Sequence, residues 1–178
     1  YVIPQEWEWV VERLKLHGVE VEKLTNNMNI KVTKYKFKDV KFSEVPYEGR
    51  QTVNYNYEVF TAEEIVPEGS FIVKTEQRAL RVILWLLEPK SGDSFLRWGF
   101  FNTIFEKKEY FEPYVMEKIA VEMLNEIPGL KEEFELKLAE DEIFRGNPYQ
   151  RLNFFYEGSP YFDQKLNFYP VLRVENSF

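Results

Sequence analysis

The chain has 178 residues, no cysteine and a formal net charge of −7 at pH 7, with a pI near 5.0. Its composition of 44% hydrophobic and 17% aromatic residues can build a sizeable core, which excludes a chain that is disordered throughout. The lack of cysteine excludes disulfides and thiolate metal sites. The acidic balance argues against nucleic-acid binding, because phosphates need clustered and uncompensated Lys and Arg.

The first predicted element is a helix. Pro4 suits a first helical position, and apolar residues recur at helical spacing as far as Leu14. Gly18 is a suitable left-handed stop, and His17 lies in the last turn, where cations are favoured. We therefore expect a helix that starts near Pro4 and ends before Gly18.

Strand-like sequence follows. Residues 30–42 are apolar in alternation, but Val32 and Tyr35 fall in opposite phases. An extra residue in a strand shifts this phase, so the pattern predicts a β-bulge at Thr33 or Lys34. Residues 53–59 alternate cleanly between apolar and polar side chains, which predicts a strand with one buried face.

The second half of the chain is predicted to be mainly helical. Thr75 is a suitable cap for a helix that must end before Pro89. Residues 95–105 are ambiguous between a buried strand and a short helix, with an extended or loop conformation preferred, and Pro113 can begin another helix. Further helical segments are expected at 130–138 and 149–156, and residues 168–174 predict a final edge strand.

Early strands followed by later helices predict an α+β fold, with a mainly antiparallel sheet in the N-terminal half packed with several helices. No repeat or linker is visible, so we expect residues 1–178 to form a single domain. Because Tyr1 is not an initiator Met, we expect a fragment of a longer protein. The longest apolar run, 82–87, is far short of the roughly 20 residues that span a bilayer.

Catalytic signatures are scarce. His17 is the single histidine, so a zinc centre with two or three histidines cannot be assembled, and a conventional serine triad would have to recruit His17. No Gly-x-Ser-x-Gly elbow and no glycine-rich phosphate loop is present. Paired carboxylates for glycoside hydrolysis stay formally open, but 30 acidic residues make that signal unspecific.

Residues 86–114 are dense in aromatic side chains, which predicts either the centre of a core or a contact surface. We expect most of these rings in the core. Trp98, beside Arg97, is the ring we expect to be exposed, and Asn102 could add a polar contact. Arg50 is a second candidate contact, for which a structural ion pair is the alternative.

Several passages of the sequence, taken together, resemble a known protein family. They are YVIPQEWEWVVERLKLHGV at 1–19, VPYEGR at 45–50, VPEGSFIVKTEQRALRVILWLLEPKSGDSFLRWGFFNTIFEKKEY at 66–110 and YPVLRV at 169–174. Together they resemble the C-terminal region of a bacterial family of large zinc carboxypeptidase-like proteins of the carboxypeptidase A type. In that family the peptidase domain comes first and holds the zinc ligands and the catalytic Glu, which have no counterpart at any position here.

The resemblance implies a non-catalytic C-terminal accessory domain of a secreted zinc metallocarboxypeptidase, located outside the cell, in the periplasm or at the cell envelope. It implies no cofactor in this chain, zinc in the parent peptidase domain, and that upstream domain of the same polypeptide as the partner. Packing against or assisting the peptidase domain is the preferred role. A carbohydrate- or peptidoglycan-binding module, or an acidic glycoside hydrolase, is the alternative, with a peptide or glycan as the ligand.

Overall fold

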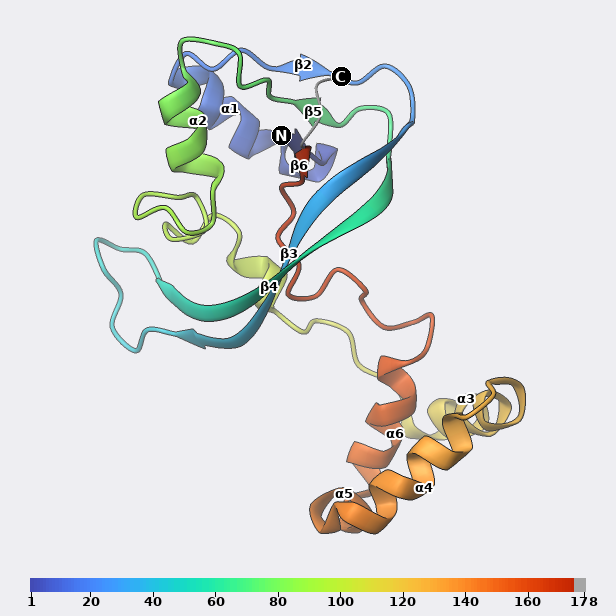
Figure 1. Ribbon diagram of the computed structural model, residues 1–178. Helices are drawn as coiled ribbons and strands as arrows, with labels where there is room; N and C mark the ends of the chain where they lie inside the picture. Colours follow the sequence, from blue (N-terminus) through green and yellow to red (C-terminus); the bar gives the residue numbers. More distant parts are fainter. Residues whose placement is uncertain (175–178) are drawn as a thin grey trace. The chain divides into compact units, whose positions relative to one another are not determined.

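The computed structural model describes residues 1–174, which divide into two compact units (Figure 1). The first unit comprises residues 1–106 and 165–174, and the second comprises residues 107–164. All strands lie in the first unit, and every strand pairing is antiparallel. The predicted α+β class, with antiparallel sheets in the N-terminal half, is therefore confirmed.

The predicted opening helix is present. A 3-10 turn, η1 (Gln5–Trp7), follows Pro4 and leads directly into α1 (Glu8–Leu16). The buried face of α1 includes Leu14, which is fully inaccessible to solvent. Gly18 then adopts φ 76°, a left-handed conformation that glycine reaches without steric cost and that ends the helix as predicted.

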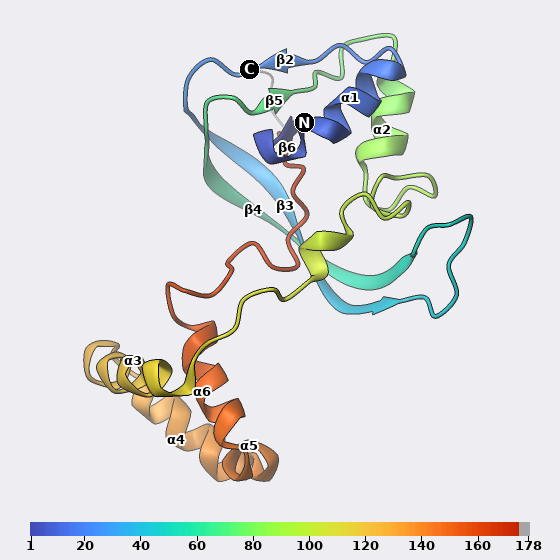
Figure 2. The same cartoon turned by 180° about the vertical axis from the view of Figure 1, so that it is seen from behind.

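The first unit contains two three-stranded sheets, with strand orders β1-β5-β2 and β4-β3-β6. Figure 1 shows β3 and β4 as a long twisted ribbon, and Figure 2 shows the same ribbon from behind. The strands are β1 (Val2–Ile3), β2 (Glu22–Lys23), β3 (Met28–Phe42), β4 (Val53–Val66), β5 (Phe71–Ile72) and β6 (Arg173–Val174).

The bulge predicted at Thr33 or Lys34 is wrong. β3 and β4 keep one register up to Lys38, and the shift comes after it, where Asp39 has φ 52°. Val32 and Thr33 point to opposite faces of the strand, yet both are buried. The phase change in the sequence therefore marks a stretch that is covered on both faces.

Residues 95–101 of the aromatic segment contribute to the first unit's core, whereas residues 107–114 belong to the second unit. Phe95, Leu96 and Phe101 are almost fully buried. Phe101 meets Trp7 edge-to-face at a centroid distance of 4.8 Å and Tyr169 at 5.3 Å, so it joins the N-terminal helix to the C-terminal segment. The 3-10 helix η2 (Asn102–Phe105) ends this segment, whose irregular conformation agrees with the prediction.

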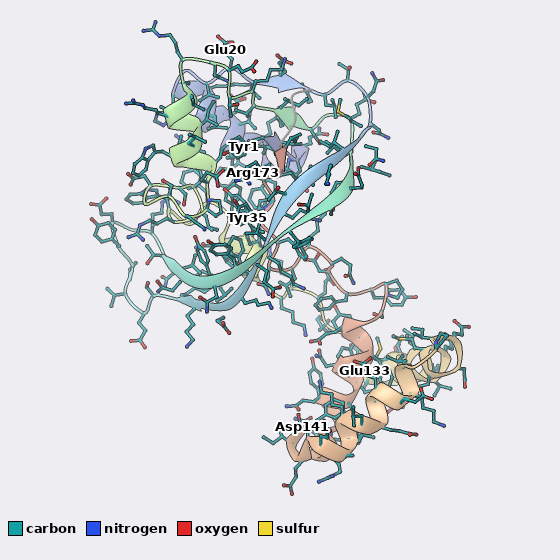
Figure 3. The ribbon with its side chains drawn as sticks, in the orientation of Figure 1. Tyr1, Glu20, Tyr35, Glu133, Asp141 and Arg173 are labelled. Carbon is teal, nitrogen blue, oxygen red and sulfur yellow. The ribbon has the colours of Figure 1, made fainter. Side chains whose placement is uncertain are left out.

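The helix predicted to begin after Thr75 starts later, as α2 (Leu80–Leu87). The Gln77 side chain accepts a hydrogen bond from the Glu20 backbone N–H at 2.8 Å and donates one to the Glu20 carbonyl at 3.1 Å. This pairing holds the chain before α2 in a turn against the irregular segment around Glu20, which Figure 3 labels. A long-range contact therefore displaced the start of the helix.

The second unit contains only helices among the residues that the structure describes. The four helices are α3 (Pro113–Glu126), α4 (Leu130–Glu140), α5 (Glu142–Gly146) and α6 (Pro148–Glu157). Asp141 and Asn147 cap α5 and α6 with side-chain oxygens that accept from Phe144 N and Gln150 N. Residues 107–164 hold seven basic and 13 acidic side chains, so a net charge of −6 belongs to this unit.

Tyrosine hydroxyls gather at the carboxyl end of α2. Tyr169 Oη donates to the carbonyl of Leu87 at 2.6 Å, and Tyr55 Oη donates to the carbonyl of Pro89 at 2.6 Å. The last carbonyls of a helix have no partner within it, so buried helix ends need such donors. Tyr55 of β4 and Tyr169 of the C-terminal segment thus supply hydrogen-bond donors at the end of one short helix.

Glu88 extends this cluster. Its two carboxylate oxygens accept hydrogen bonds from Tyr1 Oη and, at 3.2 Å, from Tyr35 Oη. The Arg173 guanidinium lies 3.9 Å from the same carboxylate. Figure 3 labels Tyr1, Tyr35 and Arg173, which lie together in the first unit. We call Tyr1, Tyr35, Tyr55, Tyr169 and Glu88 the tyrosine cluster.

The tyrosine cluster favours neutral phenols. Burial raises the pKa of Tyr1, and the hydrogen bond to Glu88 raises it further. Burial likewise raises the pKa of Tyr35 and Tyr55, and that of Tyr169 lies well above its ordinary value. An ionised phenol would lose its donor proton and place a second negative charge beside Glu88.

These shifts predict alkaline unfolding of the first unit. Because the four phenols have a raised pKa in the folded state, their contribution to stability is complete below about pH 10, the pKa of an unfolded tyrosine. It is lost as the pH rises above that value. We expect a denaturation midpoint that falls steeply above pH 10, measured by circular dichroism alongside phenolate absorbance. Ionisation of all 11 tyrosines with the secondary structure intact would contradict this expectation.

Candidate functional site

The described residues do not fit a zinc centre. Within residues 1–174, no group of three or more His, Cys, Asp or Glu side chains is placed to hold a metal ion. His17 is exposed at the end of α1, and its backbone N–H donates to the carbonyl of Leu14 at 2.9 Å. We therefore assign no step of a reaction to a metal held by these residues.

The residues predicted from the sequence as contacts come from two segments that meet in the structure. One segment is the loop between β3 and β4, residues 43–52, and the other is residues 94–102. We call these two segments together the hairpin clamp. They contain the predicted residues Arg50, Arg97, Trp98 and Asn102.

A tight turn forms the tip of the hairpin. Tyr47 and Arg50 exchange two backbone hydrogen bonds of 2.9 Å each. Between them, Glu48 and Gly49 have φ values of 47° and 71°. Positive φ at both central residues is the signature of a type I′ turn, whose twist matches that of antiparallel strands. The turn thereby presents the Tyr47 and Arg50 side chains at the tip.

Aromatic contacts attach this tip to the second segment. The rings of Tyr47 and Trp98 lie 6.3 Å apart at an angle of 38°. The Arg50 guanidinium carbon lies 5.2 Å from the ring centre of Phe100, which itself stacks on Trp9 of α1 at 5.2 Å. For Arg50, the structure therefore gives a cation–π contact, whereas the sequence had offered an ion pair as the alternative.

Asn102 makes the polar contact of the clamp. Its Nδ2 donates to the carbonyl of Gln51 at 3.0 Å, while its buried Oδ1 has no hydrogen-bond partner among the described residues. Gly99 has φ 72°, and a Cβ there would lie 2.9 Å from Asn102 Nδ2 and 3.2 Å from the Gln51 carbonyl oxygen. Glycine at position 99 therefore permits the close approach of the two segments.

The clamp leaves part of its surface open to solvent. The Tyr47 side chain is 58% exposed, Arg50 and Arg97 are exposed, and Trp98 is half-buried. The Arg97 backbone N–H donates to Ser94 Oγ at 3.1 Å, which fixes the backbone from which the guanidinium extends. Tyr, Trp and Arg are the side chains most frequent at binding hot spots, so this surface is suited to contact another macromolecule.

Sequence reasoning missed two members of the site. The sequence patterns do not single out Tyr47, and they predict that most rings of residues 86–114, Phe100 among them, lie in the core. The Glu48-Gly49 pair between two strands was the signal that could have placed Tyr47 at a hairpin tip. No local signal pairs Phe100 with Arg50, because the contact joins residues 50 positions apart.

Replacement of Gly99 should open the clamp. We expect Gly99→Ala to lower the free energy of unfolding by about 2–4 kcal/mol, since it adds backbone strain to a clash with Asn102 and Gln51. Gly18→Ala is the matched control, because Gly18 has φ 76° with no atom within 4 Å of a Cβ. It should cost only about 1 kcal/mol. If urea denaturation shows the same loss of unfolding free energy for both variants, the close approach at Gly99 is unimportant for stability.

The comparisons with known proteins find partial relatives among carboxypeptidases. The chain is 32% identical over 99 residues to "Carboxypeptidase 2" of Trichophyton tonsurans. It is also 32% identical over 99 residues to "Carboxypeptidase 2" of Trichophyton rubrum. It is 30% identical over 93 residues to "Probable carboxypeptidase 2" of Arthroderma benhamiae. These alignments cover 56% or 52% of this chain. No protein-family model and no solved structure matches the chain.

These relatives are fungal, whereas the sequence passages resemble a bacterial family. The chain spans only 18% of the length of each of these relatives, so most of each relative lies outside the matched stretch. The comparisons therefore show that this chain is similar to a limited part of carboxypeptidases.

Proposed function

We propose that this chain is a non-catalytic C-terminal accessory region of a secreted zinc metallocarboxypeptidase, in which it packs against the peptidase domain of the same polypeptide. The observation that carries the proposal is the partial match to carboxypeptidases, which spans 18% of their length. The chemistry of peptide hydrolysis is then left to the larger part of the polypeptide. Zinc, where bound, would activate water in that part and not in this chain.

Two features of the structure support an accessory role. The described residues bring no set of metal-binding side chains together. The hairpin clamp, in contrast, presents Tyr47 and Arg50 from a turn held by two backbone hydrogen bonds, and Arg97 and Trp98 from the segment that packs against this turn. A preorganised surface loses little conformational freedom when it binds, which suits it to a permanent contact.

The proposed location is outside the cytoplasm, as the resemblance implies. Among the described helices, none combines the length and the apolar character that crossing a bilayer requires. The proposed partner is the peptidase domain, and covalent connection would hold it at a high effective concentration beside the clamp.

Arg97→Ala tests the contact in the polypeptide that carries this chain. The side chain is exposed, so the isolated chain should lose less than about 0.5 kcal/mol of stability. In the longer polypeptide, we expect the loss of a contact worth about 1–2 kcal/mol, measured as a lower thermal midpoint of the peptidase domain. Tyr161→Ala is the control, because Tyr161 is 65% exposed and belongs to the second unit.

Hydrolysis and zinc content test the assignment of catalysis. The purified chain should release no C-terminal amino acid from a peptide substrate and should hold no stoichiometric zinc. The longer polypeptide should release the C-terminal amino acid and should hold stoichiometric zinc. Turnover or tightly held zinc in the chain alone would overturn the proposal. Hydrolysis of a glycan by the chain would favour the glycoside hydrolase alternative instead.

A further inference from the structure

The α2 helix is apolar around its whole circumference. Of the residues Leu80–Leu87, only Arg81 is polar. Ile83 and Leu87 are fully buried in the core, whereas Leu80, Leu84 and Trp85 are 39%, 40% and 55% exposed. We call these three exposed side chains the α2 outer face. A helix that is apolar on all sides is normally covered on all sides, so this face lacks a partner in the described chain.

The α2 outer face is held in place, and two arginines lie next to it in the sequence. Figures 1 and 2 both place α2 at the margin of the first unit. Hydrogen bonds from the tyrosine cluster fix the carboxyl end of the helix. Arg78 and Arg81 are exposed beside the face, and within residues 1–174 no ion pair engages either of them. A rigid apolar surface with unpaired guanidinium groups at its rim fits a partner with an apolar patch and neighbouring carboxylates.

We infer that the α2 outer face docks onto the peptidase domain of the same polypeptide, through an apolar patch with carboxylates at its rim. This inference rests on the proposed function and adds a contact surface separate in sequence from the hairpin clamp. Most of each carboxypeptidase relative lies outside the matched stretch, so a tethered domain is available at high effective concentration. Trp85 would be the central side chain of the contact, since a large exposed ring gains most from burial.

A second copy of this chain fits the face less well. In a symmetric dimer the same patch meets itself, so the two copies would bring their Arg78 and Arg81 side chains close together. Like charges without intervening carboxylates oppose such a contact. The basic rim therefore favours a different and acidic surface over self-association.

Hydroxyl-radical footprinting tests the inference by comparing this chain with the longer polypeptide. We expect labelling of Trp85 to fall by about fivefold in the longer polypeptide, because an interface core is packed as densely as a protein interior. Phe60 is the internal control: it lies on β4, is 39% exposed and should label equally in both. Tyr47 reports on the hairpin clamp in the same experiment.

Leu84→Glu and Leu16→Glu form the matched pair of variants. Both leucines are exposed on short helices, at 40% and 76%, so neither change should unfold this chain. In the longer polypeptide, Leu84→Glu should restore Trp85 labelling to the level of the chain alone, and Leu16→Glu should leave it low.

Equal labelling of Trp85 in the two proteins would overturn the inference. Protection of Trp85 in the chain alone, together with a dimeric mass in light scattering, would assign the face to a second copy and also overturn it. If Trp85 stays exposed while Tyr47 is protected and hydrolysis requires the longer polypeptide, the docking face is wrong and the proposed function stands.

Discussion

The structure of the first unit depends on how the buried carboxyl end of α2 is satisfied. Helix ends leave carbonyl groups without partners, and in an apolar environment each unsatisfied carbonyl is costly. Here Tyr55 on β4 and Tyr169 near the C-terminal strand donate to backbone carbonyls at this end, and Tyr1 and Tyr35 donate to the Glu88 carboxylate beside it. The β3–β4 ribbon, the N-terminal segment and the C-terminal segment therefore converge on the end of one short helix. Movement of Tyr55 or Tyr169 would leave a backbone carbonyl there without this donor.

The two surfaces that we assign to contacts follow from this constraint. The chain leaves α2 at Glu88 and enters the segment that ends at Asn102, so the anchored helix sets where that segment meets the hairpin tip. The close approach at Gly99 and the Arg50–Phe100 contact then fix the tip against it. The same anchoring leaves the opposite side of α2 exposed, since only one face of the helix can turn toward the core.

Local patterns identified much of the fold. The α1 and α3 helices agree with the periodicity of the sequence, because each buries a regular set of apolar side chains, and the predicted strand at residues 53–59 lies within β4. Patterns failed where a distant segment intervened. Because Val32 and Thr33 are both buried, the apolar pattern there looked like that of a bulge. The pairing of Gln77 with Glu20 moved the start of α2. No linker rich in Pro, Gly or Ser marks the boundary between the two units at residues 106 and 107, although most of the negative charge lies in the second unit.

By itself, the sequence determined the fold class and the residue types available for contact, since both follow from composition and from spacing along the chain. It singled out Arg50, Arg97, Trp98 and Asn102 one by one. Only the tertiary structure decided that they lie together, that Tyr47 and Phe100 join them, and that α2 leaves Trp85 exposed. The first two outcomes depend on contacts between residues about 50 positions apart, and the third on which side of α2 turns toward the core, and no local pattern records either geometry.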